Sequence, residues 1–244
     1  MSNKWREIWE NREINEAELY CGETKRVFLE LKRIAGFDIT SNALDYEQFY
    51  NQYIETKNEL EFCAISKSRP IESIFELGCG CGANLFLFQK DKIEVGGIDY
   101  SGAEIEIARK ILNNPKELIC DEAVAAPTEL KYDAVISNSV FSYFESYEYA
   151  RKVLEIMYCK AKYSIGLIDI HDIKKKEAFI EFRKSIIEDY EERYEGLPKF
   201  FYDKAFFLDF AEQHDMSIRI TQPKMRNYWN NDFVFNCFLI KNTI

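Results

Sequence analysis

The segment Glu76-Leu77-Gly78-Cys79-Gly80-Cys81-Gly82-Ala83 carries the densest chemical signal in this chain. Its three glycines stand at alternate positions. Because glycine lacks a Cβ atom, such a loop turns tightly and lets backbone amides approach a ligand. Between a strand and a helix, this pattern predicts a nucleotide-type pocket. A purely structural strand-to-helix turn is the alternative interpretation of the loop taken alone.

Acidic residues follow the next two apolar runs of the chain. Asp99 closes the run 93–98 and lies 21 residues after Gly78. At that position a carboxylate can accept both hydroxyls of a ribose. Asp121 follows the run 117–120 in the same way. The loop and the two carboxylates together point to a ligand that contains a nucleoside.

The elements that must position these residues alternate between short apolar runs and amphipathic helices. We expect strands at residues 71–77, 93–98, 117–120, 133–137, 163–169, 217–221 and 232–240. Expected helices cover 83–89, 103–112, a stretch around 150–157, 178–190 and a segment after Asp203. Ser101 and Glu104 predict a capping box at the start of the second of these helices.

The strand connections predict the sheet topology. Strands separated by helices imply parallel pairs with right-handed crossovers. Only a loop joins the last two runs, which therefore look like an antiparallel pair. The final run is apolar on both faces, as is typical of a strand inside a sheet.

Residues 1–69 contain no clear strand. Apolar side chains recur there at three- and four-residue spacings, which indicates amphipathic helices. The residues that carry this pattern are Trp5, Ile8, Trp9, Val27, Phe28, Leu31, Ile34, Ala35, Tyr46, Phe49, Tyr50 and Tyr53. We expect a helical cap or lid over residues 1–69 and one α/β domain over residues 70–244.

At these positions the chain resembles the class I S-adenosylmethionine-dependent methyltransferases, whose first motif is an acid, any residue, then Gly-x-Gly-x-Gly. Glu76 and the three glycines match each fixed position of that motif. The resemblance runs from about Ile71 to the C-terminus. It implies a Rossmann-like, doubly wound α/β sheet of seven strands, mostly parallel with an antiparallel last strand, and S-adenosylmethionine as the cofactor.

The resemblance also implies which residues contact the cofactor. Its methionine part would lie against the glycine loop, its ribose on the acid after the second strand, and its adenine near the residues that follow the second and third strands. A residue just past the fourth strand would face both the methionine part and the substrate. The implied residues are Glu76, Gly78, Cys79, Gly80, Gly82, Asp99, Tyr100, Asp121, Glu122 and Asn138.

A dinucleotide is the competing interpretation of the same loop. Gly78, Gly80 and Ala83 also fit the G-x-G-x-x-G/A fingerprint, and Asp99 has the spacing that an NAD ribose requires. Glu76, Asp121 and the terminal antiparallel pair favour a methyltransferase over an NAD(P)-dependent oxidoreductase. A non-catalytic, cofactor-binding partner subunit is a further alternative.

The segment Ile168-Asp169-Ile170-His171-Asp172 ends the fifth expected strand, at the sheet edge where ligands of open α/β folds bind. Methyl transfer to a hydroxyl requires alignment and removal of a proton. We predict that His171 is the general base and that Asp169 orients it; a surface histidine is the alternative. Two carboxylates with one histidine form no specific metal pattern, so we expect no metal.

Charge and loop composition bear on the methyl acceptor. The formal net charge of −10 disfavours nucleic acid as a partner. The sequence Ser137-Asn138-Ser139-Val140 also differs from the Asn/Asp-Pro-Pro-aromatic motif of DNA-base methyltransferases. The polar and aromatic loop 222–231, which contains Arg226, Tyr228 and Trp229, predicts a lid over a small polar molecule. We expect O-methylation of a hydroxyl on a sugar, a sugar nucleotide or a secondary metabolite.

The cysteines and the start of the chain predict its compartment. Seven cysteines are an odd number, and the first residues form no apolar leader. These features predict reduced thiols and a cytoplasmic protein. No apolar run approaches the ~20 residues that span a bilayer, so we expect no membrane partner. The chain is expected to be a monomer or a homodimer.

Overall fold

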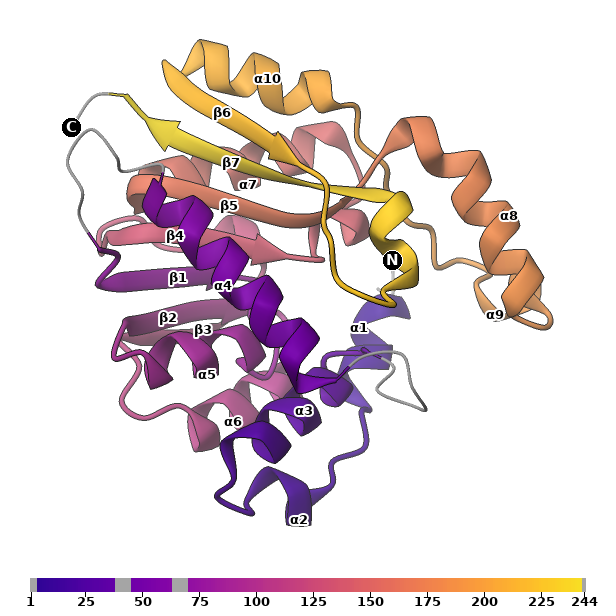
Figure 1. The fold of residues 1–244 in the computed structure, drawn as a ribbon, viewed down its shortest axis with the longest axis horizontal. Coiled ribbons are helices and arrows are strands. Elements are labelled where there is room, and N and C mark those ends of the chain that lie inside the picture. The colour runs from indigo at the N-terminus through magenta and orange to yellow at the C-terminus, as the bar shows by residue number, and fades with distance from the viewer. Residues whose placement is uncertain (1–3, 38–44, 63–69, 243–244) are drawn as a thin grey trace.

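The computed structural model describes residues 4–37, 45–62 and 70–242. These residues form a seven-stranded sheet with the order β3-β2-β1-β4-β5-β7-β6 (Figure 1). The strands are β1 Ser73–Leu77, β2 Glu94–Asp99, β3 Glu117–Cys120, β4 Tyr132–Asn138, β5 Ala161–His171, β6 Met216–Thr221 and β7 Val234–Lys241.

The strand directions match the expected topology. β1 pairs in parallel with β2 and β4, and the same direction continues outward to β3 and β5. β7 runs antiparallel between β5 and β6. The predicted seven-stranded, mostly parallel sheet with an antiparallel last strand is therefore confirmed. All five residues of β1 are buried, including the polar Ser73 and Glu76, as is typical of a central strand with both faces covered.

Helices cover both faces of the sheet. The described α-helices are α1 Lys4–Glu10, α2 Glu16–Leu19, α3 Thr24–Ile34, α4 Tyr46–Phe62, α5 Ala83–Lys90, α6 Gly102–Ile111, α7 Tyr147–Lys160, α8 Lys176–Ile186, α9 Tyr190–Arg193 and α10 Lys204–Gln213. Short 3-10 helices are η1 Ala123–Ala125, η2 Phe141–Tyr143, η3 Ile173–Lys175 and η4 Trp229–Asp232. The prediction of one helix over 178–190 is wrong in its extent. α8 ends at Ile186, and Asp189 adopts a left-handed φ of 55° before α9 begins.

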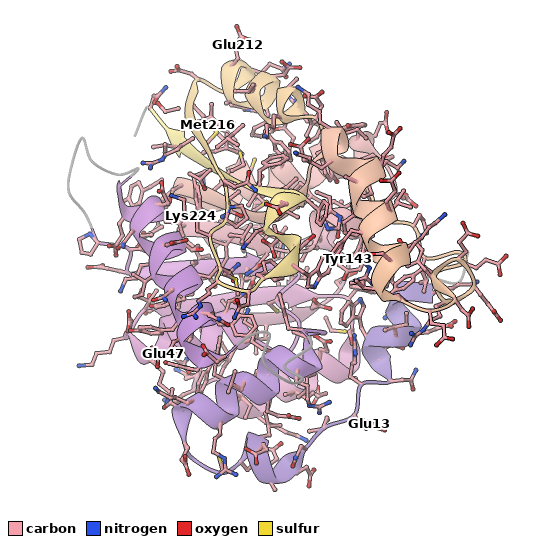
Figure 2. All side chains as sticks on the ribbon, turned by 45° about the vertical axis from the view of Figure 1, so that its right-hand side comes forward. Glu13, Glu47, Tyr143, Glu212, Met216 and Lys224 are labelled. Atoms are coloured by element: carbon pink, nitrogen blue, oxygen red, sulfur yellow. The ribbon has the colours of Figure 1, made fainter. Side chains whose placement is uncertain are left out.

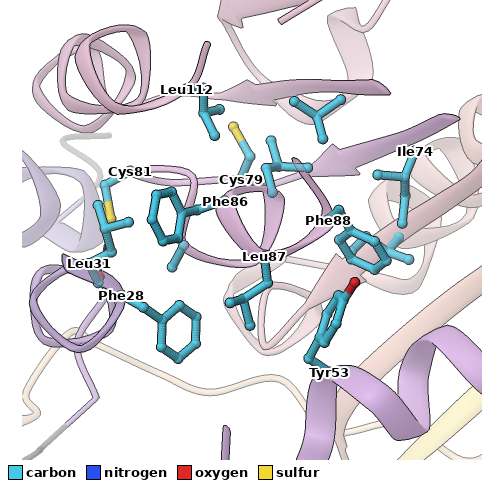
Figure 3. Packing of buried hydrophobic residues seen from close by; sticks show 14 of the residues in the cluster. Phe28, Leu31, Tyr53, Ile74, Cys79, Cys81, Phe86, Leu87, Phe88 and Leu112 are labelled. Atoms are coloured by element: carbon cyan, nitrogen blue, oxygen red, sulfur yellow. Dashed lines mark hydrogen bonds between the residues drawn. The ribbon is translucent and has the colours of Figure 1, made fainter. Parts of the chain in front are cut away.

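The first described segments are helical, as the spacing of their apolar residues predicts. α3 buries Phe28 and Leu31 completely against the face of the sheet that also carries α4 and α5. Figure 3 shows these two side chains beside Phe86 and Leu87 of α5. The segments 1–3, 38–44 and 63–69 of the expected cap lie outside the described residues, so the division into a cap and a domain stays a prediction.

The chain reverses its winding between β1 and β4. The helix after β1, α5, belongs to the buried cluster on one face of the sheet, and the helix after β4, α7, belongs to the cluster on the other. Where the connections from two neighbouring strands go to opposite faces of the sheet, a crevice remains beyond the carboxyl ends of those strands. Loop 78–82 and Asn138 stand at that crevice. None of the described helices is long and apolar enough to cross a membrane.

Replacing Phe28 by alanine tests how firmly α3 is attached. The ring has no exposed surface, so Phe28→Ala should lower the free energy of unfolding by ~3–5 kcal/mol through lost burial and a residual cavity. Urea denaturation followed by circular dichroism measures the loss. Tyr20→Ala is the control, since that side chain is 51% exposed and its removal should change stability little. Equal losses in the two variants would contradict the packing described here.

Candidate active site

A cavity of about 290 Å³ lies at the carboxyl ends of β1, β2 and β4. The glycine loop and the ends of these strands form its inner wall. Trp5 and Trp9 of α1 close another side, and both rings meet Tyr143 edge to face at 4.8 and 5.8 Å. Tyr143 is labelled in Figure 2.

The glycine loop has the geometry that its sequence predicts. Gly78, Gly80 and Gly82 have φ values of 72°, 50° and 81°, a region that favours glycine. A Cβ atom at Gly78 would lie 2.3 Å from Cγ2 of Val140, and one at Gly80 would lie 2.3 Å from Oε2 of Glu104. The contact with Val140 requires glycine at Gly78, whereas a side chain at Gly80 would displace the Glu104 carboxyl group and strain the positive φ.

Asp99 connects the loop to the end of β2. Its Oδ2 accepts a hydrogen bond from the Gly80 amide at 2.8 Å, and its Oδ1 accepts one from the Ser101 amide at 2.8 Å. The residue is 8% exposed, and burial raises the pKa of its carboxyl group. Each carboxylate oxygen has a second acceptor position. Asp99 can therefore hold the loop and still accept hydrogen bonds from a ligand in the cavity.

Glu104 differs from its predicted role in a capping box. The Ser101 Oγ accepts from the Glu104 amide at 3.3 Å, as expected. The return bond to the Ser101 amide is missing because that amide already donates to Asp99. The Glu104 carboxyl instead lies against Gly80 on the cavity wall, with Oε1 buried and without a hydrogen-bond partner. Burial raises its pKa to about 8.

Two polar residues of the cavity wall were not identified from the sequence. Lys32 of α3 donates from Nζ to Oδ1 of Asn84 at 2.7 Å. The Asn84 amide in turn donates to Oε1 of Glu76 at 2.6 Å, and all three residues line the cavity. The sequence does hold a signal, since Lys32 stands four residues after Phe28 and thus on the apolar face of α3.

The ends of β4 and β5 meet through Ser139 and Asp169. Both residues have left-handed backbone conformations, with φ values of 61° and 59°, and such strain in residues other than glycine gathers at functional sites. Ser139 lines the cavity, and its single hydroxyl proton can be donated either to Oδ2 of Asp169 at 3.2 Å or to Oδ1 of Asn138 at 3.0 Å. The hydroxyl of Tyr228 donates to the same Asp169 oxygen at 2.6 Å. The other Asp169 oxygen is buried without a partner, and burial raises the pKa of this carboxyl group.

His171 lies apart from this group. Its ring contacts Phe179 and Phe201, with centroids 4.9 and 5.1 Å away, and it is not among the described residues that line the cavity. The side chain is buried, so the alternative interpretation as a surface histidine is wrong. Burial, with Lys199 and Arg183 nearby, lowers its pKa to about 3.

The other predicted residues divide between the cavity wall and its surroundings. Residues on the wall are Glu76, Gly78, Cys79, Gly80, Asp99, Tyr100, Glu122 and Asn138. Gly82 caps α5, and Asp121 is exposed with its carboxylate bound to the Glu122 amide. No residue of the loop 222–231 is among the described residues of the wall. Tyr228 is instead buried against Asp169, and Trp229 packs on Phe182.

A family model described as a methyltransferase domain matches residues 75–161, a segment that runs from the last residues of β1 to the start of β5. The matched segment includes the glycine loop, Asp99 and Ser139. Residues 75–161 therefore form a methyltransferase domain, as the resemblance to the class I S-adenosylmethionine-dependent methyltransferases predicts. Residues 1–74, which supply Trp5, Trp9 and Lys32 to the cavity, precede the matched segment.

Two relatives of this chain carry the name malonyl-[acyl-carrier protein] O-methyltransferase. The protein of Priestia megaterium is 34% identical over 77 residues, which are 30% of this chain and 28% of the relative. The protein of Acetivibrio thermocellus is 29% identical over 116 residues, which are 46% of this chain and 41% of the relative. The chain thus matches less than half the length of either relative.

Solved structures share the fold across nearly the whole chain. The magnesium protoporphyrin IX methyltransferase of Synechocystis, solved with S-adenosylmethionine, has a TM-score of 0.58 at 13% identity, over 95% of this chain and all of that one. The plantazolicin methyltransferase BpumL, solved with S-adenosylhomocysteine and a substrate analogue, has a TM-score of 0.57 at 16% identity, over 99% and 98% of the two chains.

The residues of this methyltransferase fit S-adenosylmethionine. The glycine loop leaves a backbone surface that a side chain would disrupt, and Asp99 keeps acceptor positions for a ribose. Buried oxygens of Glu76 and Glu104 on the cavity wall have no hydrogen-bond partner among the residues that the structure describes. A buried polar atom without a partner is costly unless a ligand or water supplies one.

The raised pKa of Glu104 predicts how stability depends on pH. Between its ordinary value of 4.5 and about 8, the folded ligand-free protein holds a proton that the unfolded chain has lost. The free energy of unfolding should therefore fall as pH rises through this window, by up to ~1.4 kcal/mol per pH unit from this group. Glu104→Gln should remove that part of the slope.

Urea unfolding at about pH 5.5 and pH 7.5 measures this slope. Glu106→Gln is the matched control, since Glu106 lies on the same helix with an exposed side chain. If Glu104→Gln left the slope as steep as in the wild type, the assigned proton would be elsewhere.

Proposed function

We propose that this methyltransferase transfers a methyl group from S-adenosylmethionine to a hydroxyl oxygen of a small polar molecule. The observation that carries the proposal is the hydrogen bond from Ser139 on the cavity wall to the buried carboxylate of Asp169. It gives a hydroxyl in the cavity a route for its proton. The name O-methyltransferase of two relatives supports oxygen as the acceptor atom.

The cofactor would lie along the carboxyl ends of β1 and β2. Its methionine part would follow the loop at Gly78 and Gly80, and its ribose would bind Asp99. Its adenine would reach Tyr100 and Glu122, whose Oε2 already accepts from the Tyr149 hydroxyl at 3.1 Å. When bound, S-adenosylmethionine supplies a methyl group on a positively charged sulfur.

Ser139 and Asp169 would manage the proton. The acceptor hydroxyl donates its proton to Ser139 Oγ as the Ser139 hydroxyl proton passes to Asp169 Oδ2. Burial raises the pKa of Asp169, which makes it a better proton acceptor than a solvated aspartate. Tyr228 fixes the orientation of the carboxylate, while Trp5, Trp9 and Tyr143 exclude water from the cavity.

The sequence pointed to His171 as the base, with Asp169 as its partner. His171 stays a prediction, but its position among Phe179 and Phe201 and its low pKa favour Asp169 for this role. The match of residues 75–161 to a methyltransferase domain weighs against the NAD(P)-dependent alternative. A non-catalytic partner subunit differs from the proposal in one respect: it would bind the cofactor without turnover.

Asp99→Ala tests the ribose contact. Loss of a charged hydrogen-bond acceptor, and of the bond that fixes the Gly80 amide, should weaken S-adenosylhomocysteine by ~1–3 kcal/mol. Isothermal titration calorimetry measures this difference. Asp121→Ala is the control, since its exposed carboxylate is off the cavity wall. Binding of NADH in place of S-adenosylhomocysteine by the wild type would refute the proposed cofactor.

Asp169→Asn tests the proton route. The substitution keeps the shape of the side chain and removes the negative charge, so turnover should fall by ~10²–10⁴ with affinity for S-adenosylhomocysteine nearly unchanged. His171→Phe, which preserves the ring packing, should retain turnover. A loss in His171→Phe with full activity in Asp169→Asn would reverse this assignment.

The acceptor must be found before these rates can be compared. Sugar nucleotides, phenols, carboxylic acids and amines can be screened with labelled S-adenosylmethionine, and NMR of the product locates the methyl group. A methyl group on nitrogen would contradict the oxygen acceptor. Tight binding of S-adenosylhomocysteine without methylation of any compound would favour the partner-subunit alternative.

A further inference from the structure

Lys32 is a buried cation that lacks a negatively charged partner in the described part of the chain. The residue is 2% exposed, and its Nζ donates a hydrogen bond to the neutral amide oxygen of Asn84. The rings of Phe28, Phe37 and Phe49 surround its Nζ, with centroids 4.9–5.6 Å away. Burying a charge without a counterion costs several kcal/mol. Burial accordingly lowers the pKa of Lys32 to about 8.

The cavity wall carries a complementary carboxyl group next to this cation. Glu76 is 1% exposed, and its Oε1 accepts from the other end of the Asn84 amide. Its Oε2 is buried without a partner. Lys32 and Glu76 thus stand on opposite sides of one amide, both on the cavity wall, and neither neutralises the other directly. This arrangement suits a ligand that carries a carboxylate and an ammonium group on one carbon atom.

We propose that Lys32 binds the α-carboxylate of the methionine part of the cofactor, with Asn84 fixing the position of the ammonium group of Lys32. The proposal rests on the proposed function, because it takes S-adenosylmethionine as the ligand. Glu76 precedes Gly78 by two residues, so Glu76 and Lys32 lie next to the loop that would hold the methionine part. Asp99, which would hold the ribose, approaches that loop through Gly80.

The assignment makes α3 a part of the cofactor site. Lys32 precedes the segment 75–161 that matches the family model. α3 is fixed to the loop itself, since the Cys81 thiol donates to the backbone oxygen of Leu31 at 3.2 Å. The chain would therefore bind the carboxylate end of the cofactor with a residue of α3, a helix that precedes the first strand in the sequence.

Ligands that lack the carboxylate test this assignment. Lys32→Met keeps most of the side-chain volume and removes the charge. It should weaken S-adenosylhomocysteine by about 10- to 100-fold, as expected for a buried charged hydrogen bond. The same variant should bind 5′-methylthioadenosine, which lacks the amino-acid end, within about threefold of the wild type. Lys25→Met on the same helix is the matched control, since Lys25 is exposed.

A second comparison starts from the wild type, so its first part does not depend on the folding of a variant. The wild type should bind S-adenosylhomocysteine about 10- to 100-fold more tightly than its decarboxylated analogue, and this preference should vanish in Lys32→Met and persist in Lys25→Met. Calorimetry measures each affinity, and urea unfolding of the ligand-free variants reports folding.

Three outcomes would overturn the assignment. An equal loss for S-adenosylhomocysteine and 5′-methylthioadenosine would give Lys32 a structural role only. Unchanged affinity for S-adenosylhomocysteine in Lys32→Met, with normal binding by the wild type, would refute the carboxylate contact and leave the proposed function intact. A wild type that binds no S-adenosylhomocysteine would refute both.

Discussion

The two backbone hydrogen bonds that Asp99 accepts hold the centre of this molecule together. One comes from the glycine loop after β1 and the other from the start of α6, so a single carboxylate sets the distance between two βα units. The Gly78 and Cys79 amides also donate to the Ile98 oxygen at 2.8 and 3.1 Å, which adds a second connection to the same strand. The shape of the inner cavity wall depends on this junction, because the backbone of the glycine loop forms that part of the wall.

A second constraint is the density of polar groups in an otherwise apolar interior. Glu76, Glu104 and Asp169 each keep a buried oxygen without a partner, and Lys32 keeps a charge without a counterion. These groups lie on the cavity wall or directly behind it. The two faces of the sheet, in contrast, are covered by clusters of buried hydrophobic side chains. The ligand-free protein therefore concentrates its desolvation cost in one place, where a charged ligand can offset it.

The fold could be predicted from the sequence because its signals are local. Apolar runs, helical spacing and the glycine loop each depend on neighbouring residues, and β7 showed its interior position through two apolar faces. Asp99 could be anticipated because the loop fixes its spacing. Lys32 and Asn84 could not, since their meeting depends on how α3 packs against α5 across 52 residues of sequence.

The prediction for His171 shows a different limit. Alternation along a regular strand would send Asp169 and His171 to the same side. The left-handed φ of Asp169 and the register shift between Leu167 and Ile170 break this alternation at the strand end. Asp169 consequently meets Ser139, whereas His171 packs with aromatic rings. A break in backbone geometry of this kind leaves no periodic trace in the sequence.

The two tryptophans of the cavity wall stand on α1, a helix of seven residues that buries none of its side chains completely. Its contacts are side-chain contacts near the cavity. Lys4 and Trp5 donate to the backbone oxygens of Glu195 and Pro198, Arg6 lies over the Tyr100 ring, and Trp5 and Trp9 pack on Tyr143. Separating so small a surface costs far less free energy than opening the sheet. We therefore expect α1 to separate from the cavity more readily than the strands separate from one another.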